Sequence, residues 1–334
     1  MRRRDLIACA LIATAVSRAW AQPSAKVYRI AFVNTSVPAA QASTYEKPYS
    51  AAGKAFYEEL HRLGYVEGQN LVVERYSGEG RTEYSALARE VVHSNPDLIF
   101  ADSTRLVLAF KAVTTTIPIV GTTGDPVVTG LAQSLARPGG NITGVATDPV
   151  VEIWGKRLEL LKQGVPRVSR VGFLAPRSVW ESPQGAALRE ACPRVGLSLI
   201  GPSLDAPFQE VEYRRAFEAM AREGADALVV SNDPETIANR GLIVKLAEER
   251  RLPAIYSFRV FVELGGLMAY AFDLSEIYGH VANQIDQILR GTKPGEIPFY
   301  QPTKFALVIN LKTAKTLGIE MPPSLLAQAD EVIE

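Results

Sequence analysis

The chain contains 334 residues, with 36 lysines and arginines, 36 aspartates and glutamates, and a formal net charge of zero. This balance, with no strongly basic stretch after the first few residues, argues against nucleic acid as a partner. The length exceeds what one hydrophobic core commonly supports, so we expect two domains.

The first 21 residues have the pattern of a secretory signal peptide. Residues 2–4 are arginines, residues 6–16 are an apolar stretch too short to span a bilayer, and Ala21 ends a small-x-small cleavage site. We therefore predict cleavage of residues 1–21 after Ala21 and export of the mature chain. The arginines leave two export routes open, general secretory and twin-arginine. The mature chain would retain one cysteine, Cys192, which excludes an internal disulfide.

In the first half, short apolar runs typical of buried parallel strands alternate with amphipathic helical patterns. The expected strands are 29–33, 71–75, 98–101, 117–121 and 142–145, and the expected helices are 49–63, 84–94, 106–114 and 127–136. Asp125 and Pro126 provide a capping carboxylate and an N1 proline for the last of these helices. Apolar residues between Val127 and Leu135 recur at three- and four-residue spacing, which indicates one buried face.

The second half repeats this alternation. The expected strands are 171–175, 197–201, 227–231, 254–256 and 267–270, and the expected helices are 184–195, 210–223, 234–249, a short one around 261–263, and 277–289. Regular alternation of strand and helix is typical of a parallel sheet covered by helices on both faces. We therefore predict an α/β fold with two doubly wound parallel sheets.

Polar and aromatic side chains recur directly after the expected strands, where ligands bind in open parallel α/β sheets. The candidate ligand-binding residues are Asn34, Ser36, Ser103, Thr104, Thr122, Thr123 and Asp125 in the first half, and Trp180, Asn232, Asp233, Tyr256 and Arg259 in the second. Hydroxyls beside a helix N-terminus suit a carboxylate, and aromatic rings suit an apolar body. The alternative is that the polar groups cap helices and the rings pack into cores. For Asp125 we favour the cap.

Recognisable catalytic and metal-binding patterns are missing from the sequence. The three histidines, His61, His93 and His280, have no second histidine or cysteine at metal-ligand spacing. No serine lies in a nucleophile-elbow motif. We therefore expect a binding protein that is not an enzyme and needs no metal or cofactor, with a secreted α/β hydrolase as an alternative.

Several separated motifs resemble one protein family. Residues 125–144 read DPVVTGLAQSLARPGGNITG, residues 63–70 read LGYVEGQN, residues 265–268 read GGLM, and residues 301–334 form the tail QPTKFALVINLKTAKTLGIEMPPSLLAQADEVIE. Taken in their order along the chain, these motifs resemble those of ABC-transporter solute-binding proteins related to the tryptophan- and tyrosine-binding group. The resemblance extends from about residue 27 to the end of the chain.

The resemblance implies a type I periplasmic binding fold, in which the chain crosses between two lobes more than once. We assign lobe 1 to 26–146 plus 274–303 and lobe 2 to 147–273 plus 304–334. It also implies a monomeric periplasmic protein that closes on a small organic ligand, a carboxylate or an aromatic or apolar amino acid, and delivers it to an ABC permease. A ligand-sensing subunit of a signalling system is the alternative.

One departure from the family bears on the ligand. Relatives that bind amino acids place an acidic residue after the strand that matches 254–256, whereas residues 256–259 here read Tyr-Ser-Phe-Arg. This favours a simple carboxylate, with Arg259 as a possible cationic partner. The alternative is that Arg259 pairs with Glu263, four residues later on a helix.

Overall fold

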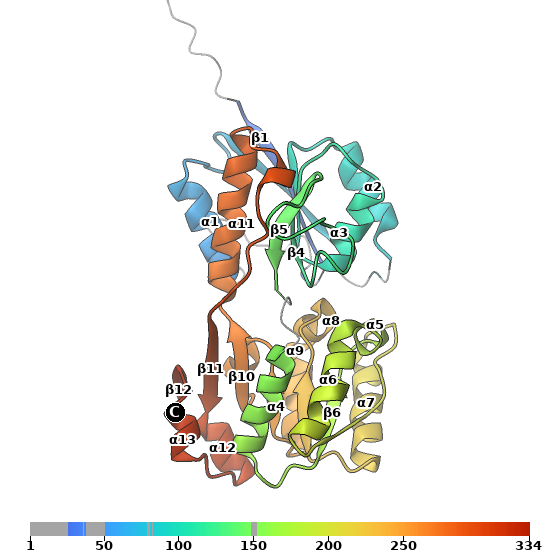
Figure 1. Ribbon diagram of the computed structural model, residues 1–334, viewed down its shortest axis with the longest axis vertical. Helices are drawn as coiled ribbons and strands as arrows, with labels where there is room; N and C mark the ends of the chain where they lie inside the picture. Colours follow the sequence, from blue (N-terminus) through green and yellow to red (C-terminus); the bar gives the residue numbers. More distant parts are fainter. Residues whose placement is uncertain (1–25, 36, 38–50, 79–80, 82, 148–151) are drawn as a thin grey trace, which may run out of the picture.

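The computed structural model describes residues 26–35, 37, 51–78, 81, 83–147 and 152–334, which form two lobes, one above the other in Figure 1. Lobe 1 contains a parallel five-stranded sheet in the order β2-β1-β3-β4-β5. Its strands are β1 (Tyr28–Asn34), β2 (Leu71–Ser77), β3 (Leu98–Ala101), β4 (Ile119–Thr123) and β5 (Ile142–Ala146). The apolar run of β3 is buried throughout because helices cover both faces of the sheet.

The covering helices of lobe 1 come from distant parts of the chain. They are α1 (Ala51–Arg62), α2 (Ser85–His93), α3 (Thr104–Lys111) and α11 (Leu274–Leu289). Helices α1 and α11 pack together on one face, and α2 and α3 pack together on the other. The rings of Phe32, Phe56 and Phe100 meet in the core with centroids 4.8 to 5.7 Å apart. Burial of each such ring contributes about 1.5–3 kcal/mol.

Lobe 2 contains a seven-stranded sheet in the order β12-β11-β10-β9-β8-β6-β7. Its strands are β6 (Arg170–Leu174), β7 (Ser198–Ile200), β8 (Ala227–Val230), β9 (Ala254–Tyr256), β10 (Met268–Phe272), β11 (Phe305–Asn310) and β12 (Glu331–Ile333). Neighbouring strands are parallel except β10 and β11, which are antiparallel. They run in opposite directions because the chain enters β11 from lobe 1, at the end of the sheet where β10 leaves it.

The helices of lobe 2 surround this sheet. They are α4 (Glu152–Gly164), α5 (Arg177–Trp180), α6 (Pro183–Arg194), α7 (Glu210–Arg222), α8 (Pro234–Ala238), α9 (Arg240–Glu249), α10 (Arg259–Glu263), α12 (Leu311–Leu317) and α13 (Pro323–Leu326). A short 3₁₀ turn, Pro294–Glu296, precedes the return of the chain from lobe 1. Among the described helices, none is long and apolar enough to span a bilayer.

The chain passes between the lobes three times. Strand β5 of lobe 1 is followed by α4 of lobe 2, β10 is followed by α11 of lobe 1, and the segment around Thr303 leads back to β11. The prediction of two α/β lobes with several crossings is therefore confirmed, and the lobe 2 sheet differs from a fully parallel one because β11 and β12 run antiparallel to its other strands. The bounds 26–146 plus 274–303 and 147–273 plus 304–334 stay a prediction, with which the sheet membership of the strands is compatible.

The prediction of a helix over 127–136 is wrong. The chain makes a turn after Asp125 and then continues as an irregular loop. Gly130 adopts a left-handed φ of 69°, which ends the helical geometry after about one turn. The backbone N–H groups of Leu131 and Ala132 both donate to the carbonyl of Pro126, at 2.7 and 2.9 Å. The apolar spacing therefore belongs to a loop that folds back on itself.

Other differences concern element bounds. The predicted helix 234–249 is two helices, α8 and α9, because the backbone of Asn239 between them is not helical. Thr122 and Thr123 lie within β4 and not in the loop after it. Helix α4 and the strands and helices after residue 304 were not among the predicted elements.

Candidate ligand-binding site between the lobes

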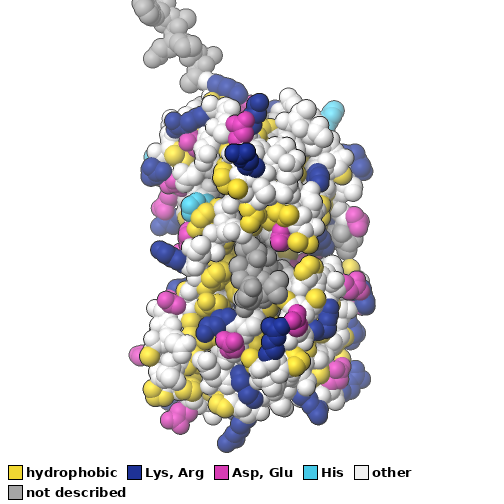
Figure 2. Space-filling model, viewed as in Figure 1, with side chains coloured by type: hydrophobic (Ala, Val, Ile, Leu, Met, Phe, Trp, Pro, Cys, Tyr) yellow, Lys and Arg dark blue, Asp and Glu magenta, His cyan; other side chains and the backbone are white. Residues whose placement is uncertain are grey.

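The carboxyl ends of the parallel strands in both sheets point towards the other lobe. Strand β5 ends just before the chain passes into lobe 2, and β10 ends just before it passes into lobe 1. Because β1, β3 and β4 run parallel to β5, and β6, β8 and β9 run parallel to β10, these strands all end at the inter-lobe side of their sheet. Figure 2 shows apolar side chains of both lobes gathered at the waist between them. The strand ends therefore define one candidate site.

At the end of β1, Asn34 shapes the loop that follows. Its Nδ2 donates to the carbonyl of Tyr76 at 3.3 Å, and its Oδ1 accepts from the backbone N–H of Val37 at 2.7 Å. Asn34 is buried, and both hydrogen bonds stay within lobe 1. The structure thus shows a loop-forming role for Asn34. The other candidate in this loop, Ser36, lies outside the described residues.

Asp102, which the sequence analysis did not select, joins the ends of β1 and β3. Its Oδ1 accepts from the backbone N–H of Thr35 at 3.1 Å and from the Thr35 hydroxyl at 3.2 Å. Desolvation raises the pKa of Asp102 to about 7, although the hydrogen bonds from Thr35 act in the opposite direction. The charge of this strand-end carboxyl therefore changes near neutral pH. Its position directly before Ser103 is the signal that could have identified it.

Ser103 and Thr104 open α3. The Ser103 Oγ accepts from the backbone N–H of Leu106 at 3.4 Å, and the Thr104 Oγ1 accepts from the backbone N–H of Gly124 at 2.9 Å. Each hydroxyl also carries a hydrogen that it can donate to a carboxylate. The first turn of α3 adds N–H groups and the positive end of the helix dipole. The capping role of Ser103 is thus established, and ligand binding by this pair stays a prediction.

The end of β4 carries two threonines and an aspartate. Thr123 is buried, and its hydroxyl donates to the next carbonyl at 3.3 Å, whereas Thr122 is half-buried. The Asp125 Oδ1 accepts from the backbone N–H groups of Val127 at 2.8 Å and Val128 at 3.0 Å. Asp125 therefore caps the turn that follows the strand, which is the role that the sequence favoured.

In lobe 2, Asn232 and Asp233 follow β8. Asp233 is buried and caps α8, because its Oδ1 accepts from the backbone N–H of Thr236 at 3.0 Å and its Oδ2 accepts from the hydroxyl of Ser231. Burial raises the pKa of Asp233, against the effect of these hydrogen bonds. Asn232 is half-buried at the strand end. Asp233 thus holds the loop from β8 to α8 in place.

The two aromatic candidates contact other rings of lobe 2. Tyr256 is 1% exposed, and its ring stacks on Phe261 with centroids 4.8 Å apart. Burial raises the pKa of the Tyr256 phenol. The ring of Trp180 lies 5.1 Å from that of Phe173. These contacts are the core-packing alternative of the sequence analysis, and ligand contact by either ring stays a prediction.

Arg259 is paired with carboxylates of its own lobe. Its Nε donates to Glu263 at 2.8 Å, and its Nη2 donates to Glu331 at 2.8 Å. The Arg259 side chain is 52% exposed. The structure therefore shows the helix pair of the sequence alternative and adds a second carboxylate from β12. A ligand carboxylate would have to compete with both.

Arg105 makes a contact between the lobes that the sequence analysis missed. This residue lies in the first turn of α3, and its Nη2 forms an ion pair with Glu235 in the first turn of α8. The two side chains are 34% and 11% exposed. Arg105 directly follows the candidates Ser103 and Thr104, and Glu235 lies two residues after the candidate Asp233. These positions are a signal for each residue alone and do not encode their pairing. Within the described ranges, no group of three or more His, Cys, Asp or Glu residues is placed to hold a metal ion.

A family model described as "ABC transporter substrate binding protein" matches residues 47–333. The chain belongs to this family. It is 27% identical over 273 residues to the "Tyrosine-binding protein" of Clostridioides difficile, a match that covers 80% of this chain and 77% of that protein. The family resemblance noted in the sequence is thereby confirmed.

Two solved structures support the fold of this substrate-binding protein. A conserved domain protein from Vibrio cholerae is 25% identical, with a TM-score of 0.78 over 92% of this chain and all of the other. An ABC domain from Streptococcus pneumoniae in complex with L-Trp is 23% identical, with a TM-score of 0.78 and the same coverage. Membership of this family supports a ligand-binding role for the chain.

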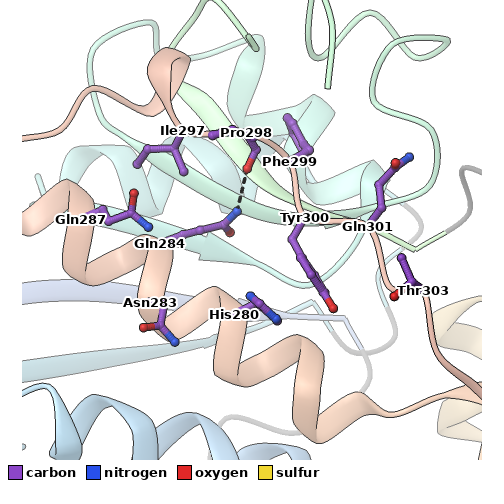
Figure 3. A pocket seen from close by; sticks show the side chains of 10 residues that line it. All are labelled: His280, Asn283, Gln284, Gln287, Ile297, Pro298, Phe299, Tyr300, Gln301 and Thr303. Carbon is purple, nitrogen blue, oxygen red and sulfur yellow. Dashed lines mark hydrogen bonds between the residues drawn. The ribbon is translucent and has the colours of Figure 1, made fainter. Parts of the chain in front are cut away.

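A pocket of the substrate-binding protein lies beside α11 in lobe 1. It has a volume of about 390 Å³ and is lined by α11 and residues 297–303, as Figure 3 shows. The amide nitrogen of Gln284 donates to the carbonyls of Gly144 at 2.9 Å and Pro298 at 3.1 Å. Its Oε1 is buried and accepts no hydrogen bond from the described residues. The amide thus ties α11 to β5 and to the segment that leads back to lobe 2.

Proposed function

We propose that this chain is the periplasmic binding subunit of an ABC importer and captures a small organic ligand between its lobes. The observation that carries this proposal is the meeting of the strand ends of both sheets, where Arg105 of lobe 1 contacts Glu235 of lobe 2. A ligand at this position is contacted by both lobes, so closure of the lobes increases its contacts. Membership of the substrate-binding family supports this function.

The ligand class we propose is a small carboxylate or an aromatic or apolar amino acid. The relatives named for tyrosine and solved with L-Trp support the aromatic amino acid. In this chain, a ligand carboxylate would accept hydrogen bonds from the hydroxyls of Ser103 and Thr104 and from the first turn of α3. Both groups lie on the inter-lobe side of lobe 1.

The ammonium group of an amino acid ligand would have fewer candidate partners than its carboxylate. No carboxylate directly follows β9, and Asp233 after β8 is buried and already accepts hydrogen bonds within its loop. Asp273, after β10, is exposed and caps α11 through the backbone N–H of Ser275 at 2.8 Å. Asp273 is therefore the partner we propose if the ligand is an amino acid.

The test begins with mass spectrometry of the small molecules that co-purify with the exported protein. Calorimetric titration with L-tryptophan, L-tyrosine and the matching acids without the amino group then measures which class binds. We expect binding of at least one, with a smaller radius of gyration by X-ray scattering at saturation. If no small molecule binds and the radius never changes, the proposal is wrong.

Thr104→Val tests the carboxylate contact directly. Loss of a hydrogen bond to a charged group should weaken binding about tenfold or more. The matched control is Thr116→Val, an exposed threonine at the opposite end of the lobe 1 sheet, which should leave the affinity unchanged. Equal effects of the two substitutions would remove Thr104 from the site.

Export has its own test. N-terminal sequencing of the exported protein should begin at Gln22, because Ala19 and Ala21 provide the small residues that a signal peptidase requires. A lipid-modified Cys9 at the N-terminus would instead indicate a membrane-anchored receptor.

A further inference from the structure

We propose that Arg105 and Glu235 form an inter-lobe lock that holds the lobes together before any ligand binds. The lock depends on the two-lobe fold and not on the identity of the ligand. Arg105 belongs to α3 of lobe 1 and Glu235 to α8 of lobe 2, so an opening motion that separates these helices must break their ion pair. They are positioning residues, because they act on the ligand through the closure of the lobes.

The ion pair lies away from the two crossings that lead to α11 and to β11. In Figure 1, α3 lies above α8, to the right of the crossings that join β10 to α11 and lead back to β11. A third crossing, from β5 to α4, also joins the lobes. An opening motion about the crossings at β10 and β11 would separate α3 from α8 and break the ion pair.

A buried tyrosine braces the Arg105 side of the lock. The guanidinium carbon lies 5.4 Å from the centroid of the Tyr84 ring, and its Nη2 lies 3.5 Å from the Tyr84 hydroxyl. Tyr84 is 5% exposed and lies directly before α2. An arginine that rests on an aromatic ring has lost part of its rotamer freedom before it meets a carboxylate.

A second buried tyrosine braces the Glu235 side. The hydroxyl of Tyr213, in α7, donates to the backbone carbonyl of Glu235 at 2.9 Å, and Tyr213 is fully buried. The Nδ2 of Asn239 donates to the same carbonyl at 2.9 Å. The first turn of α8 is therefore anchored inside lobe 2, and the carboxylate is only 11% exposed.

These braces distinguish the pair from an ordinary surface ion pair. Exposed pairs contribute little because long side chains must be ordered and water screens the charges. Here both partners are held in their own lobes, and the carboxylate is largely shielded from water. The lock should therefore increase the closed population in the ligand-free protein, and a ligand that binds the closed form gains apparent affinity from it.

The test measures the radius of gyration of the full mature protein, stripped of ligand, by small-angle X-ray scattering. Arg105→Gln and Glu235→Gln should each increase the radius of gyration. The double variant should have a radius no larger than that of either single variant, because both substitutions break the same ion pair. The exchange Arg105→Glu with Glu235→Arg should restore the wild-type value, because it re-forms the pair. Arg259→Gln, which breaks pairs inside lobe 2, is the matched control and should leave the radius unchanged.

A ligand identified by titration provides a second readout. Each single variant should weaken its binding about fivefold or more, and the charge exchange should recover part of this loss. Thermal unfolding by circular dichroism tests whether every variant is folded. Equal ligand-free radii in the wild type and both single variants would overturn the lock, whether or not a ligand has been found. Ligand binding without any effect of the lock variants would leave the proposed function standing.

Discussion

The two lobes meet with chemically different strand ends. Lobe 1 presents the small hydroxyls of Ser103, Thr104 and Thr122, which are buried or half-buried at the inter-lobe side. In lobe 2, the candidates Tyr256 and Asp233 are buried, Tyr256 stacks on Phe261, and Asp233 accepts hydrogen bonds within its loop. We propose a division of roles, in which the lobe 1 hydroxyls donate hydrogen bonds to the ligand and the packed side chains of lobe 2 form a rigid wall.

Two arginines near the strand ends, Arg105 and Arg259, differ in the lobe that supplies their partner. Arg105 of lobe 1 pairs across the gap with Glu235, whereas Arg259 pairs with Glu263 and Glu331 inside lobe 2. Both follow a parallel strand and begin a short helix, so their sequence contexts look alike. Local sequence therefore does not reveal which arginine contacts the other lobe. That depends on where each helix lies relative to the other lobe.

The largest expected effect tests the rigid wall of lobe 2. Tyr256→Ala should lower the free energy of unfolding by about 3–5 kcal/mol, because it removes a fully buried ring that stacks on Phe261. Urea unfolding measures the loss, and hydrogen exchange should locate it in β9 and α10. Thr122→Val in lobe 1 is the control and should cost less than about 1 kcal/mol. If the protein with Tyr256→Ala is equally stable but loses ligand, the ring belongs to the site.

The next effect tests the acidic end of lobe 1. The pKa of Asp102 is raised above its ordinary value of 3.8 to about 7, so the folded state holds an extra proton between these values. The free energy of unfolding should therefore fall as the pH rises through this window and level off above it, with a loss of about 2–3 kcal/mol between pH 5 and pH 8. Urea unfolding at pH 5 and pH 8 measures this difference.

Asp102→Asn should flatten this pH dependence, because asparagine accepts the Thr35 hydrogen bonds without titrating. Other titratable groups contribute equally to both proteins, so the difference between them isolates Asp102. The same pH dependence in the wild type and the variant would show that Asp102 is ionised in the folded protein throughout this range.

The fold was predictable because its strands are short, fully buried apolar runs. β3 and β9 lie at the predicted residues, because every residue in them is buried and their sequences are therefore continuous apolar runs. The loop after Asp125 was not predictable in this way. Its apolar spacing is helical, yet Val127 and Val128 are exposed, and the left-handed Gly130 diverts the chain. Periodicity does not reveal which apolar residues a loop leaves in water.

The site was predictable as a set of positions more than as a set of roles. Parallel strands place their carboxyl ends together within each lobe, and the family resemblance implies that the two lobes face each other, so Ser103, Asp125 and Asp233 were expected at the inter-lobe side. The partner of each side chain depends on contacts between distant segments. The ion pair of Arg105 with Glu235 joins residues 130 positions apart, and no local pattern encodes it.

The smallest expected effect separates the two arginines. Arg259→Ala removes an exposed side chain from ion pairs within lobe 2, so it should lower the free energy of unfolding by less than about 1 kcal/mol. Its ligand affinity should stay within about twofold of the wild type, whereas Arg105→Gln should weaken binding further. The sequence hypothesis, in which Arg259 holds the ligand carboxylate in a dry cleft, instead predicts a loss of about 2–5 kcal/mol. Calorimetric titration of both variants with the same carboxylate decides between them, because a large loss confined to Arg259→Ala would move the cationic contact to lobe 2.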